Sequence, residues 1–187
     1  MPFIIEEQFF GEEFRIFIAI NGEYAVLHRE RPFVIGNGKD TIETLVADES
    51  YRRTHPRTNS LCPILIDPVF LEKQELHFSS IPKSGKKVYV RNTSNVAKGG
   101  YSHNMTALVH PSIIAQATKI LEIFRGLPYL GIDFMCNDIT KEQIGNSYTI
   151  VEVNVNPGVA MHMLPGDNDA VNVANILVKL MFPEIFS

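Results

Sequence analysis

The alternation of apolar and polar residues near the start of the chain predicts a β-hairpin. Residues 14–20 and 23–27 are rich in β-branched and aromatic residues, and they flank the pair Asn21-Gly22. Asn and Gly both accept the positive φ that a type I′ turn requires, so this pair is expected to join the two strands. After a loop at residues 35–40, Thr41 is expected to cap a helix that runs to about residue 48, because its hydroxyl can accept a bond from a first-turn amide.

The middle of the chain has a less regular pattern. Prolines interrupt residues 52–84, where only a short helix at about 69–74 is expected. Residues 86–91 have the composition of a strand. Residues 92–104 are polar and rich in Gly, which indicates a loop.

The last third of the chain predicts two helices and two strands. Apolar residues recur every three or four positions in 111–124, and Pro111 suits a first helical turn. Strands are expected at 129–136 and 148–155, and a last helix at 171–181. Because the strand connections are mainly of the hairpin type, the fold class is α+β, with a mostly antiparallel sheet flanked by helices. No repeat, low-complexity tract or linker divides this α+β unit.

Composition narrows the function classes. The 187 residues are 45% hydrophobic and 20% charged, which is typical of a soluble globular protein large enough to bury a core. The formal net charge of −4 argues against a nucleic-acid surface. No apolar run is long enough to cross a bilayer, and the N-terminus lacks the features of a signal peptide. Cys62 and Cys136 are too far apart for a CxxC motif, so both are expected to be reduced in a cytoplasmic protein.

The segment 150–158 carries the most informative polar residues. Alternate residues of a strand face the same way, so Glu152, Asn154 and Asn156 are expected to share one face. A half-exposed strand would show the same alternation. What sets this face apart is a carboxylate and a carboxamide as neighbouring oxygen donors.

Asp133 stands alone among apolar residues in the strand 129–136. An ionised carboxylate in such a place is costly to bury unless it is paired or binds a metal. If the two strands are neighbours, Asp133, Glu152 and Asn154 converge as hard oxygen ligands that suit Mg²⁺. The alternatives are an Asp133 paired with a nearby Arg, or one that faces solvent.

Arg91 precedes a polar loop that runs through Asn95 to Gly99-Gly100. A guanidinium at a strand end, followed by loop amides, suits a phosphate or carboxylate. Many surface loops have a similar sequence. The sequence contains neither a Walker motif nor a GxGxxG turn, so P-loop and Rossmann chemistry are not supported.

Taken in order, these segments resemble the ATP-grasp superfamily. Residues 5–15 resemble its adenosine-binding hinge, which implies that Glu6 and Glu7 lie at the hinge and that Glu13 contacts the ribose; otherwise these acids belong to a solvated segment. Residues 131–133 resemble the strand with the first metal ligand. Glu152-Val153-Asn154 with Asn156-Pro157-Gly158 resembles the E-x-N-x-x-P-G strand, so the resemblance also assigns the metal to Asp133, Glu152 and Asn154.

Within the superfamily the likeness is greatest to cyanophycin synthetase and to the glutathione synthetase module of bifunctional glutathione enzymes. It covers essentially the whole chain and is carried by residues 34–42, 90–100, 161–162, 172–174 and 181–183. It implies catalytic roles for Arg91 and Arg29, and cofactor binding by Asn95.

The chain departs from this pattern at several positions. Lys98 stands where Ser or Thr is common, His103-Asn104 replaces an apolar-Asp pair, and Arg31 stands where Pro is usual. The superfamily's earlier subdomain, with a phosphate-binding Lys and a Gly-rich loop, has no counterpart in these residues. The chain is therefore expected to be the C-terminal part of an ATP-grasp domain.

The resemblance implies an ATP-dependent carboxylate–amine ligase. A substrate carboxylate attacks the γ-phosphate of ATP to give an acylphosphate, and an amine then displaces phosphate. The implied cofactors are ATP and Mg²⁺, with two ions and with Mn²⁺ as a substitute. Small amino acids or peptides are the expected substrates, with no nucleic acid or membrane partner, and a homo-oligomer stays open. Two alternatives remain: a regulatory nucleotide-binding domain without ligase activity, and an inactive fragment of a longer enzyme.

Overall fold

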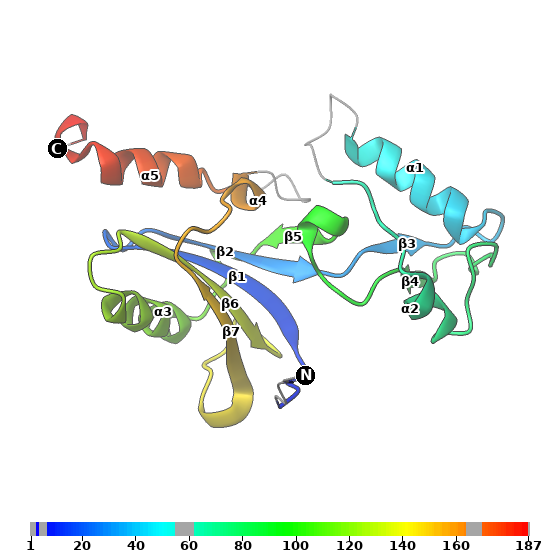
Figure 1. Cartoon of the computed structure of the whole chain (residues 1–187), viewed down its shortest axis with the longest axis horizontal. Helices are drawn as coiled ribbons and strands as arrows, with labels where there is room; N and C mark the ends of the chain where they lie inside the picture. Colours follow the sequence, from blue (N-terminus) through cyan, green and yellow to red (C-terminus); the bar gives the residue numbers. More distant parts are fainter. Residues whose placement is uncertain (1–2, 4–6, 55–61, 164–169, 187) are drawn as a thin grey trace. The chain divides into compact units, whose positions relative to one another are not determined.

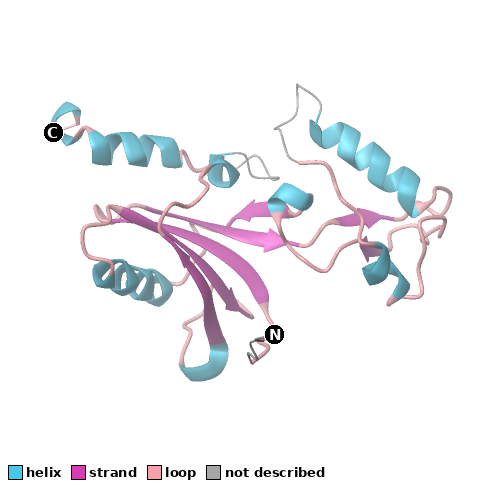
Figure 2. Ribbon diagram, viewed as in Figure 1, coloured by secondary structure: helices cyan, strands magenta, loops and turns pink. Residues whose placement is uncertain are grey.

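The computed structural model describes residues 3, 7–54, 62–163 and 170–186. Their contacts group the chain into two compact units, although the sequence has no linker between them. The first unit comprises the described parts of Met1–His28, Met105–Gly158 and Val173–Ser187, and the second those of Arg29–Asn104 and Val159–Asn172. Figures 1 and 2 show the helices and strands of both units.

The first unit is built on antiparallel strands. Within this unit the sheet has the strand order β2-β1-β6-β7, and the pairs β1–β6 and β6–β7 are antiparallel. This confirms the expected α+β class with a mostly antiparallel sheet flanked by helices. The elements of this unit are β1 (Glu12–Ala19), β2 (Tyr24–Glu30, which continues into the second unit), α3 (Pro111–Ile123), β6 (Tyr129–Cys136), η2 (Gly145–Ser147), β7 (Tyr148–Asn154), α5 (Val173–Met181) and η3 (Pro183–Ile185).

The hairpin of β1 and β2 forms as expected, but its turn differs. The Ala19 N–H donates to Glu23 O (3.0 Å), and the Gly22 N–H donates to Ala19 O (3.0 Å), so three residues form the loop. Gly22 has φ +84°, whereas Asn21 is not among the described residues with positive φ. The expected two-residue type I′ turn is therefore wrong, because it needs positive φ at both central positions. The Asn21 side chain instead accepts from the Glu23 N–H (3.2 Å).

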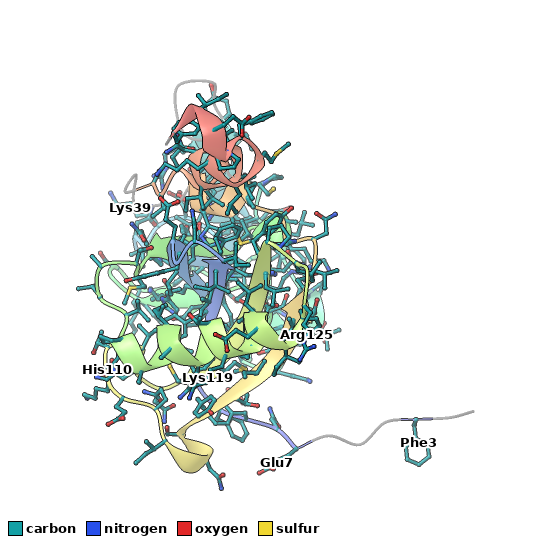
Figure 3. The ribbon with its side chains drawn as sticks, turned by 90° about the vertical axis from the view of Figure 1, so that its left-hand side faces the viewer. Phe3, Glu7, Lys39, His110, Lys119 and Arg125 are labelled. Atoms are coloured by element: carbon teal, nitrogen blue, oxygen red, sulfur yellow. The ribbon has the colours of Figure 1, made fainter. Side chains whose placement is uncertain are left out.

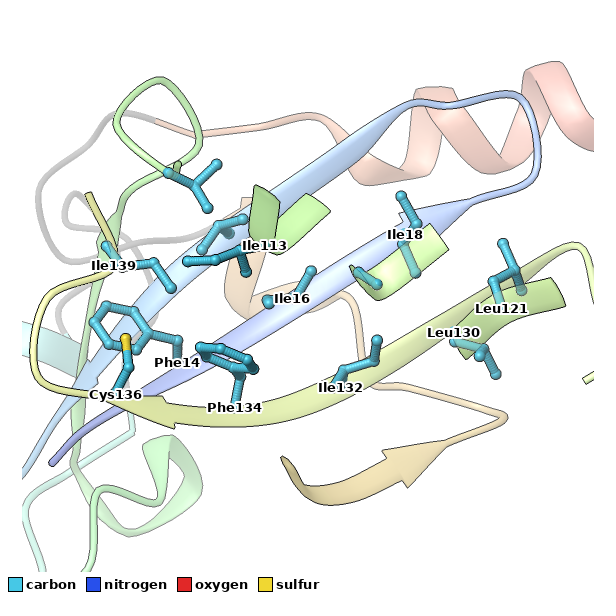
Figure 4. Packing of buried hydrophobic residues seen from close by; sticks show 13 residues of the cluster. Phe14, Ile16, Ile18, Ile113, Leu121, Leu130, Ile132, Phe134, Cys136 and Ile139 are labelled. Carbon is cyan, nitrogen blue, oxygen red and sulfur yellow. The ribbon is translucent and has the colours of Figure 1, made fainter. Parts of the chain in front are cut away.

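Helix α3 covers one face of this sheet and forms the core of the unit. Ile113 and Leu121 of the helix pack with alternate residues of β1 and β6, as Figure 4 shows. His110, whose side chain accepts from the Ser112 N–H (3.3 Å), caps the helix, and Figure 3 shows it at one end with Lys119 along the helix. The strand residues of this core are Phe14, Ile16, Ile18, Leu130, Ile132, Phe134 and Cys136. Alternate residues, including Arg15 and Asp133, therefore face the opposite side of the sheet.

The second unit holds a two-stranded sheet and a separate core. Strands β3 and β4 pair antiparallel, and helix α1 packs against them through Ile42 and Val46. The Thr44 N–H donates to Thr41 Oγ1 (3.2 Å), which confirms Thr41 as the helix cap. The elements of this unit are β3 (Phe33–Ile35), α1 (Ile42–Thr54), α2 (Pro68–Glu72), β4 (Lys87–Tyr89), η1 (Val96–Lys98), β5 (Tyr101–Asn104) and α4 (Ala160–Met163).

Several element bounds differ from the sequence expectation. Helix α1 continues six residues beyond Asp48, and the region expected as a loop at 92–104 contains β5 and the short helix η1. Arg53 explains the longer helix: the residue is 4% exposed and its guanidinium donates to the Gly99 carbonyl (2.7 Å), which holds the last turn of α1 in place. None of the helices in the described ranges is long and apolar enough to span a membrane.

Candidate functional site

Two acids and an amide meet on neighbouring strands of the first unit. Asp133 of β6 lies directly opposite Glu152 of β7, and Gly131 lies opposite Asn154. Directly opposite residues of an antiparallel pair project from the same face of the sheet. The expected neighbourhood of these two strands is therefore present, and it brings the side chains of Asp133, Glu152 and Asn154 together on the face away from α3.

A β-bulge in β7 sets which residues reach this face. The register shifts between Asp133 and Phe134, because Asp133 pairs with Glu152 while Phe134 pairs with Ile150. Val151 is thus the extra residue, and it is 61% exposed. The bulge places Glu152 and Asn154 opposite the polar face of β6, while Tyr148 stacks on Phe134 in the α3 core. Asn156 lies beyond the end of β7, so the structure does not place it on the same strand face.

The oxygen donors differ in exposure and in their present partners. Glu152 is exposed, and its Oε1 accepts a hydrogen bond from Asn154 Nδ2 (2.7 Å). The side chain of Asp133 is only 17% exposed. The set is therefore open to solvent on the β7 side and enclosed on the β6 side.

Arg15 of β1 is the charged partner of Asp133. The two residues are directly opposite in the β1–β6 pair, and Arg15 Nε lies 2.7 Å from Asp133 Oδ1. The Arg15 side chain is 9% exposed, so both charges are largely removed from water. Of the alternatives that the sequence left open, the pairing of Asp133 with a nearby Arg is the one present.

Gly131 makes room for this arrangement. A Cβ atom at Gly131 would lie 2.5 Å from Pro157 Cβ and 2.9 Å from Arg15 Nη1. Such distances are too short for a carbon atom and a heavy atom that do not share a bond. Gly131 therefore allows the Arg15 guanidinium and the Pro157 ring to lie against β6, next to Asp133.

The chemistry of this donor set fits a divalent cation. Two carboxylates and one carboxamide oxygen are the hard ligands that Mg²⁺ prefers, with water or phosphate oxygens completing its shell. Asp133 and Glu152 stand as cross-strand like charges, and the Arg15 guanidinium beside Asp133 offsets part of their repulsion. Within the described ranges, no cluster of three or more His, Cys, Asp or Glu side chains could hold a metal, so a site here depends on the Asn154 carboxamide as well.

The acids assigned to the adenosine hinge are only partly described. Glu6 lies outside the described residues, and Glu7 is exposed and outside any helix or strand. Glu13 belongs to β1, lies opposite Met135 and is two residues from Arg15. It therefore projects from the same face as Asp133, at a Cα distance of roughly 8 Å judged from strand spacing and rise.

The second unit holds the residues expected to contact an anion or the cofactor, namely Arg91, Asn95 and Arg29. Arg91 Nε donates to the Leu65 carbonyl (2.8 Å), and Nη2 donates to the Ile66 carbonyl (3.5 Å). Asn95 accepts from the Ala97 N–H (2.9 Å) and so caps η1. Arg29 is half-buried near the end of β2. Asp133, Glu152 and Asn154 belong to the first unit.

Two of the positions that depart from the superfamily pattern pack around the second unit's β4 and Glu30. Arg31 lies over the Tyr89 ring, with its guanidinium carbon 4.5 Å from the ring centroid. His103 Nε2 lies 3.3 Å from Glu30 Oε2, and Lys87 Nζ lies 2.7 Å from Glu30 Oε1. Lys98 is exposed in η1.

Arg15 is the site residue that sequence reasoning missed. A signal was present, because Arg15 interrupts an apolar run as Asp133 does in its own strand. A charged residue is rarely buried without a partner, so two such interruptions in strands of one sheet predict an ion pair.

Comparison with known proteins identifies relatives of the whole chain. A cyanophycin synthetase from Crocosphaera subtropica is 37% identical over 186 residues, covering 96% of this chain and 21% of the relative. A bifunctional glutathione biosynthesis protein from Clostridium perfringens is 34% identical over 184 residues, covering 96% of this chain and 24% of the relative. No protein-family model matches. The chain spans about a quarter or less of these relatives.

A solved structure agrees with these relatives. The bifunctional glutathione synthetase from Pasteurella multocida superposes with a TM-score of 0.76 at 28% identity, over 93% of this chain and 24% of that chain. The chain has part of an ATP-grasp fold. The resemblance to cyanophycin synthetases and bifunctional glutathione synthetases that the sequence motifs carry is confirmed by both comparisons.

Proposed function

We propose that this chain is the C-terminal part of an ATP-grasp domain in an ATP-dependent carboxylate–amine ligase. A cyanophycin synthetase and a bifunctional glutathione biosynthesis protein each match nearly the whole chain, and the β6–β7 register supports the same proposal. The single observation that carries the proposal is the cross-strand pairing of Asp133 with Glu152 beside Asn154. A sheet whose only role is structural has no need for three oxygen ligands on one face.

In this proposal, Asp133, Glu152 and Asn154 hold Mg²⁺, with two ions in the full site, and Mn²⁺ fits the same donors. The metal would offset the repulsion between the ATP phosphates and an incoming substrate carboxylate. Arg15 would fix the orientation of Asp133, since its Nε lies 2.7 Å from Asp133 Oδ1. Glu152 is already hydrogen-bonded to Asn154, so both side chains are held near the proposed position of the metal ion.

The remaining residues would bind and orient the nucleotide and the reacting carboxylate. Glu13 projects from the same sheet face as the metal ligands, which supports its assignment to the ribose, with Glu6 and Glu7 at the adenine hinge. Arg91 uses Nε and Nη2 for two carbonyls, which fixes the guanidinium and leaves Nη1 as a donor for an anion. Arg29 and Asn95 complete the proposed set, as substrate or phosphate and cofactor contacts.

The proposed substrates are small amino acids or peptides that supply a carboxylate and an amine. Cys62 and Cys136 are both free, in keeping with a reduced, cytoplasmic protein. In this proposal the reaction is the two-step one in which an acylphosphate forms and an amine displaces phosphate. The residues of this chain would hold positive charge and hydrogen-bond donors near the phosphates, where they stabilise the charge that develops in the transition state.

The proposal is tested by ADP release in a full-length protein that contains this chain. ATP, Mg²⁺ and pairs of amino acids or peptides would be supplied, and release should require both substrates. Glu152→Gln and Arg91→Ala are each expected to lower turnover by roughly 10²–10³. The exposed Glu142, in the loop before β7, gives a matched control, because Glu142→Gln makes the same charge change away from the site. Near-normal turnover with Glu152→Gln would overturn the assignment.

A further inference from the structure

The second unit contains a pocket beside the open edge of β3. Its volume is about 440 Å³. Residues of β3, of α1 and of β5 line it, so all of its walls belong to one unit. The lining residues are Phe33, Val34, Ile35, Leu45, Asp48, Glu49, Arg52 and Tyr101.

The hydrogen-bond pattern of the β3–β4 pair shows which main-chain groups face this pocket. The Val90 N–H donates to Pro32 O (2.9 Å), and the Gly36 N–H donates to Lys86 O (2.8 Å). Bonded and non-bonded pairs alternate along an antiparallel ladder, so Val34 is the next residue that bonds to β4. The N–H and C=O groups of Phe33 and Ile35 therefore point away from β4, along the open edge.

This edge is only lightly occupied. Tyr101 Oη lies 3.4 Å from the Phe33 carbonyl oxygen, while its proton is donated to Glu49 Oε1 at 3.0 Å. Among the described residues, no other group is hydrogen-bonded to the outward amides and carbonyls of Phe33 and Ile35. Ile35 is 48% exposed. A row of outward donors and acceptors beside a pocket is the arrangement to which an extended peptide adds as a further strand.

The charges of the pocket differ in how far they are compensated. Glu49 Oε1 accepts from Tyr101 Oη (3.0 Å) and lies 3.4 Å from Arg53 Nε, and Glu49 is also ion-paired with Arg52. Asp48 is exposed and has no charged partner in the described part of the chain. Of the two carboxylates that line the pocket, Asp48 is therefore the one without an ion pair among the described residues, and it can pair with a positively charged group of a ligand.

The aromatic rings of the pocket already have cationic partners. Lys87 Nζ lies 3.8 Å from the Phe33 ring centroid, and the Arg53 guanidinium carbon lies 4.1 Å from that of Tyr101. The two rings also stack on each other, with centroids 4.4 Å apart. The two rings form a fixed wall of the pocket. A positively charged group of a ligand is therefore expected at Asp48 and not over the rings.

We propose that this pocket and the open edge of β3 bind a short, positively charged peptide in an extended conformation. The peptide main chain bonds to the outward groups of Phe33 and Ile35, and a Lys or Arg side chain of the peptide pairs with Asp48. This site is independent of the metal ligands and nucleotide contacts proposed above. Its failure would leave the ligase proposal unchanged, and the reverse also holds.

The first test uses the complete chain and three versions of one peptide. The probe is the capped heptapeptide Thr-Val-Thr-Lys-Thr-Val-Thr, titrated calorimetrically. Two further versions carry N-methyl groups on alternate amides, one on the odd positions and the other on the even positions. An added strand presents only one of these amide sets to β3, so one version should lose binding and the other keep it. Equal binding of both versions, or no binding of the parent peptide at millimolar concentration, would overturn the proposal.

The second test changes the protein. Ile35→Pro removes only an outward N–H, which edge strands tolerate, and should weaken binding roughly three- to tenfold, the range for one hydrogen bond. Asp48→Asn should weaken it roughly two- to fivefold, as expected for an exposed ion pair. The matched control is Glu43→Gln, which removes an exposed acid from the same helix outside the pocket. The proposal fails if this control weakens binding as much as Asp48→Asn does.

Discussion

Arg15 Nε lies 2.7 Å from Asp133 Oδ1, on directly opposed positions of β1 and β6. Both side chains are largely buried, so removing one leaves the other charge uncompensated. Arg15→Met is expected to lower the free energy of unfolding by about 3 kcal/mol, measured by urea denaturation. The double variant with Asp133→Leu should recover most of this loss, because neither charge then remains buried. A single variant within about 0.5 kcal/mol of the original would contradict a tight, desolvated pair.

Gly131 allows Arg15 and Pro157 to lie against β6. Gly131→Ala places a Cβ 2.5 Å from Pro157 Cβ, and we expect a loss of about 1–3 kcal/mol from the forced displacement. Gly158→Ala is the matched control, since a Cβ there has no heavy atom within 4 Å. The control should stay within about 0.5 kcal/mol of the original in the same denaturant measurement. Equal effects of the two changes would show that the space at Gly131 does not matter.

Glu30 makes the stability of the second unit depend on pH. Burial raises the pKa of Glu30, but the hydrogen bonds from Lys87 and then Tyr89 outweigh it, so its pKa is lowered from 4.5. A lowered pKa in the folded state adds stability above pH 4.5 that is lost as the pH falls through the folded-state value. The stability difference between the original chain and Glu30→Gln should therefore be constant near neutrality and shrink below about pH 4.5. A difference independent of pH down to pH 3 would contradict this role of the Glu30 carboxylate.

Cys136 gives the opposite kind of pH dependence. Burial raises the pKa of its thiol from 9.0 to about 11. The unfolded thiol ionises first as the pH rises, so stability should decline between about pH 9 and pH 11. Cys136→Val should lack that part of the decline, as followed by urea denaturation at each pH. In the native chain a thiol reagent should modify the half-buried Cys62 well before Cys136, and equal rates would contradict the burial.

The sequence predicts the parts of the fold that have long periodic patterns. Strand β6 begins and ends at the expected residues, and α3 differs by one residue. Their apolar residues are numerous and regularly spaced, so burial and local preference agree. Strands β3 and β5 have three and four residues, too few for a periodic signal, and tertiary contacts stabilise them.

The pairing of the two strands that carry the candidate site is predicted from the sequence, but their exact register is not. The pattern correctly indicates that β6 and β7 carry Asp133, Glu152 and Asn154, and their adjacency is confirmed. The bulge at Val151 does not follow from the sequence, because alternation alone cannot reveal one extra residue in a strand. Because of the bulge, Tyr148 and Ile150 pair with residues of the α3 core, whereas strict alternation would put them on the same face of the sheet as Glu152.

Paramagnetic broadening by Mn²⁺ tests whether Asp133, Glu152 and Asn154 form a divalent metal site. Substoichiometric Mn²⁺ would be added to the ¹⁵N-labelled chain, and amide signals would be compared between the original chain, Glu152→Gln and Glu142→Gln. Glu152 and Glu142 are both exposed, so neither change should disturb folding. Amides around Asp133 and Glu152 should broaden first. Glu152→Gln should abolish this broadening, and Glu142→Gln should leave it unchanged. Broadening elsewhere, or broadening unchanged by Glu152→Gln, would contradict the proposed metal site.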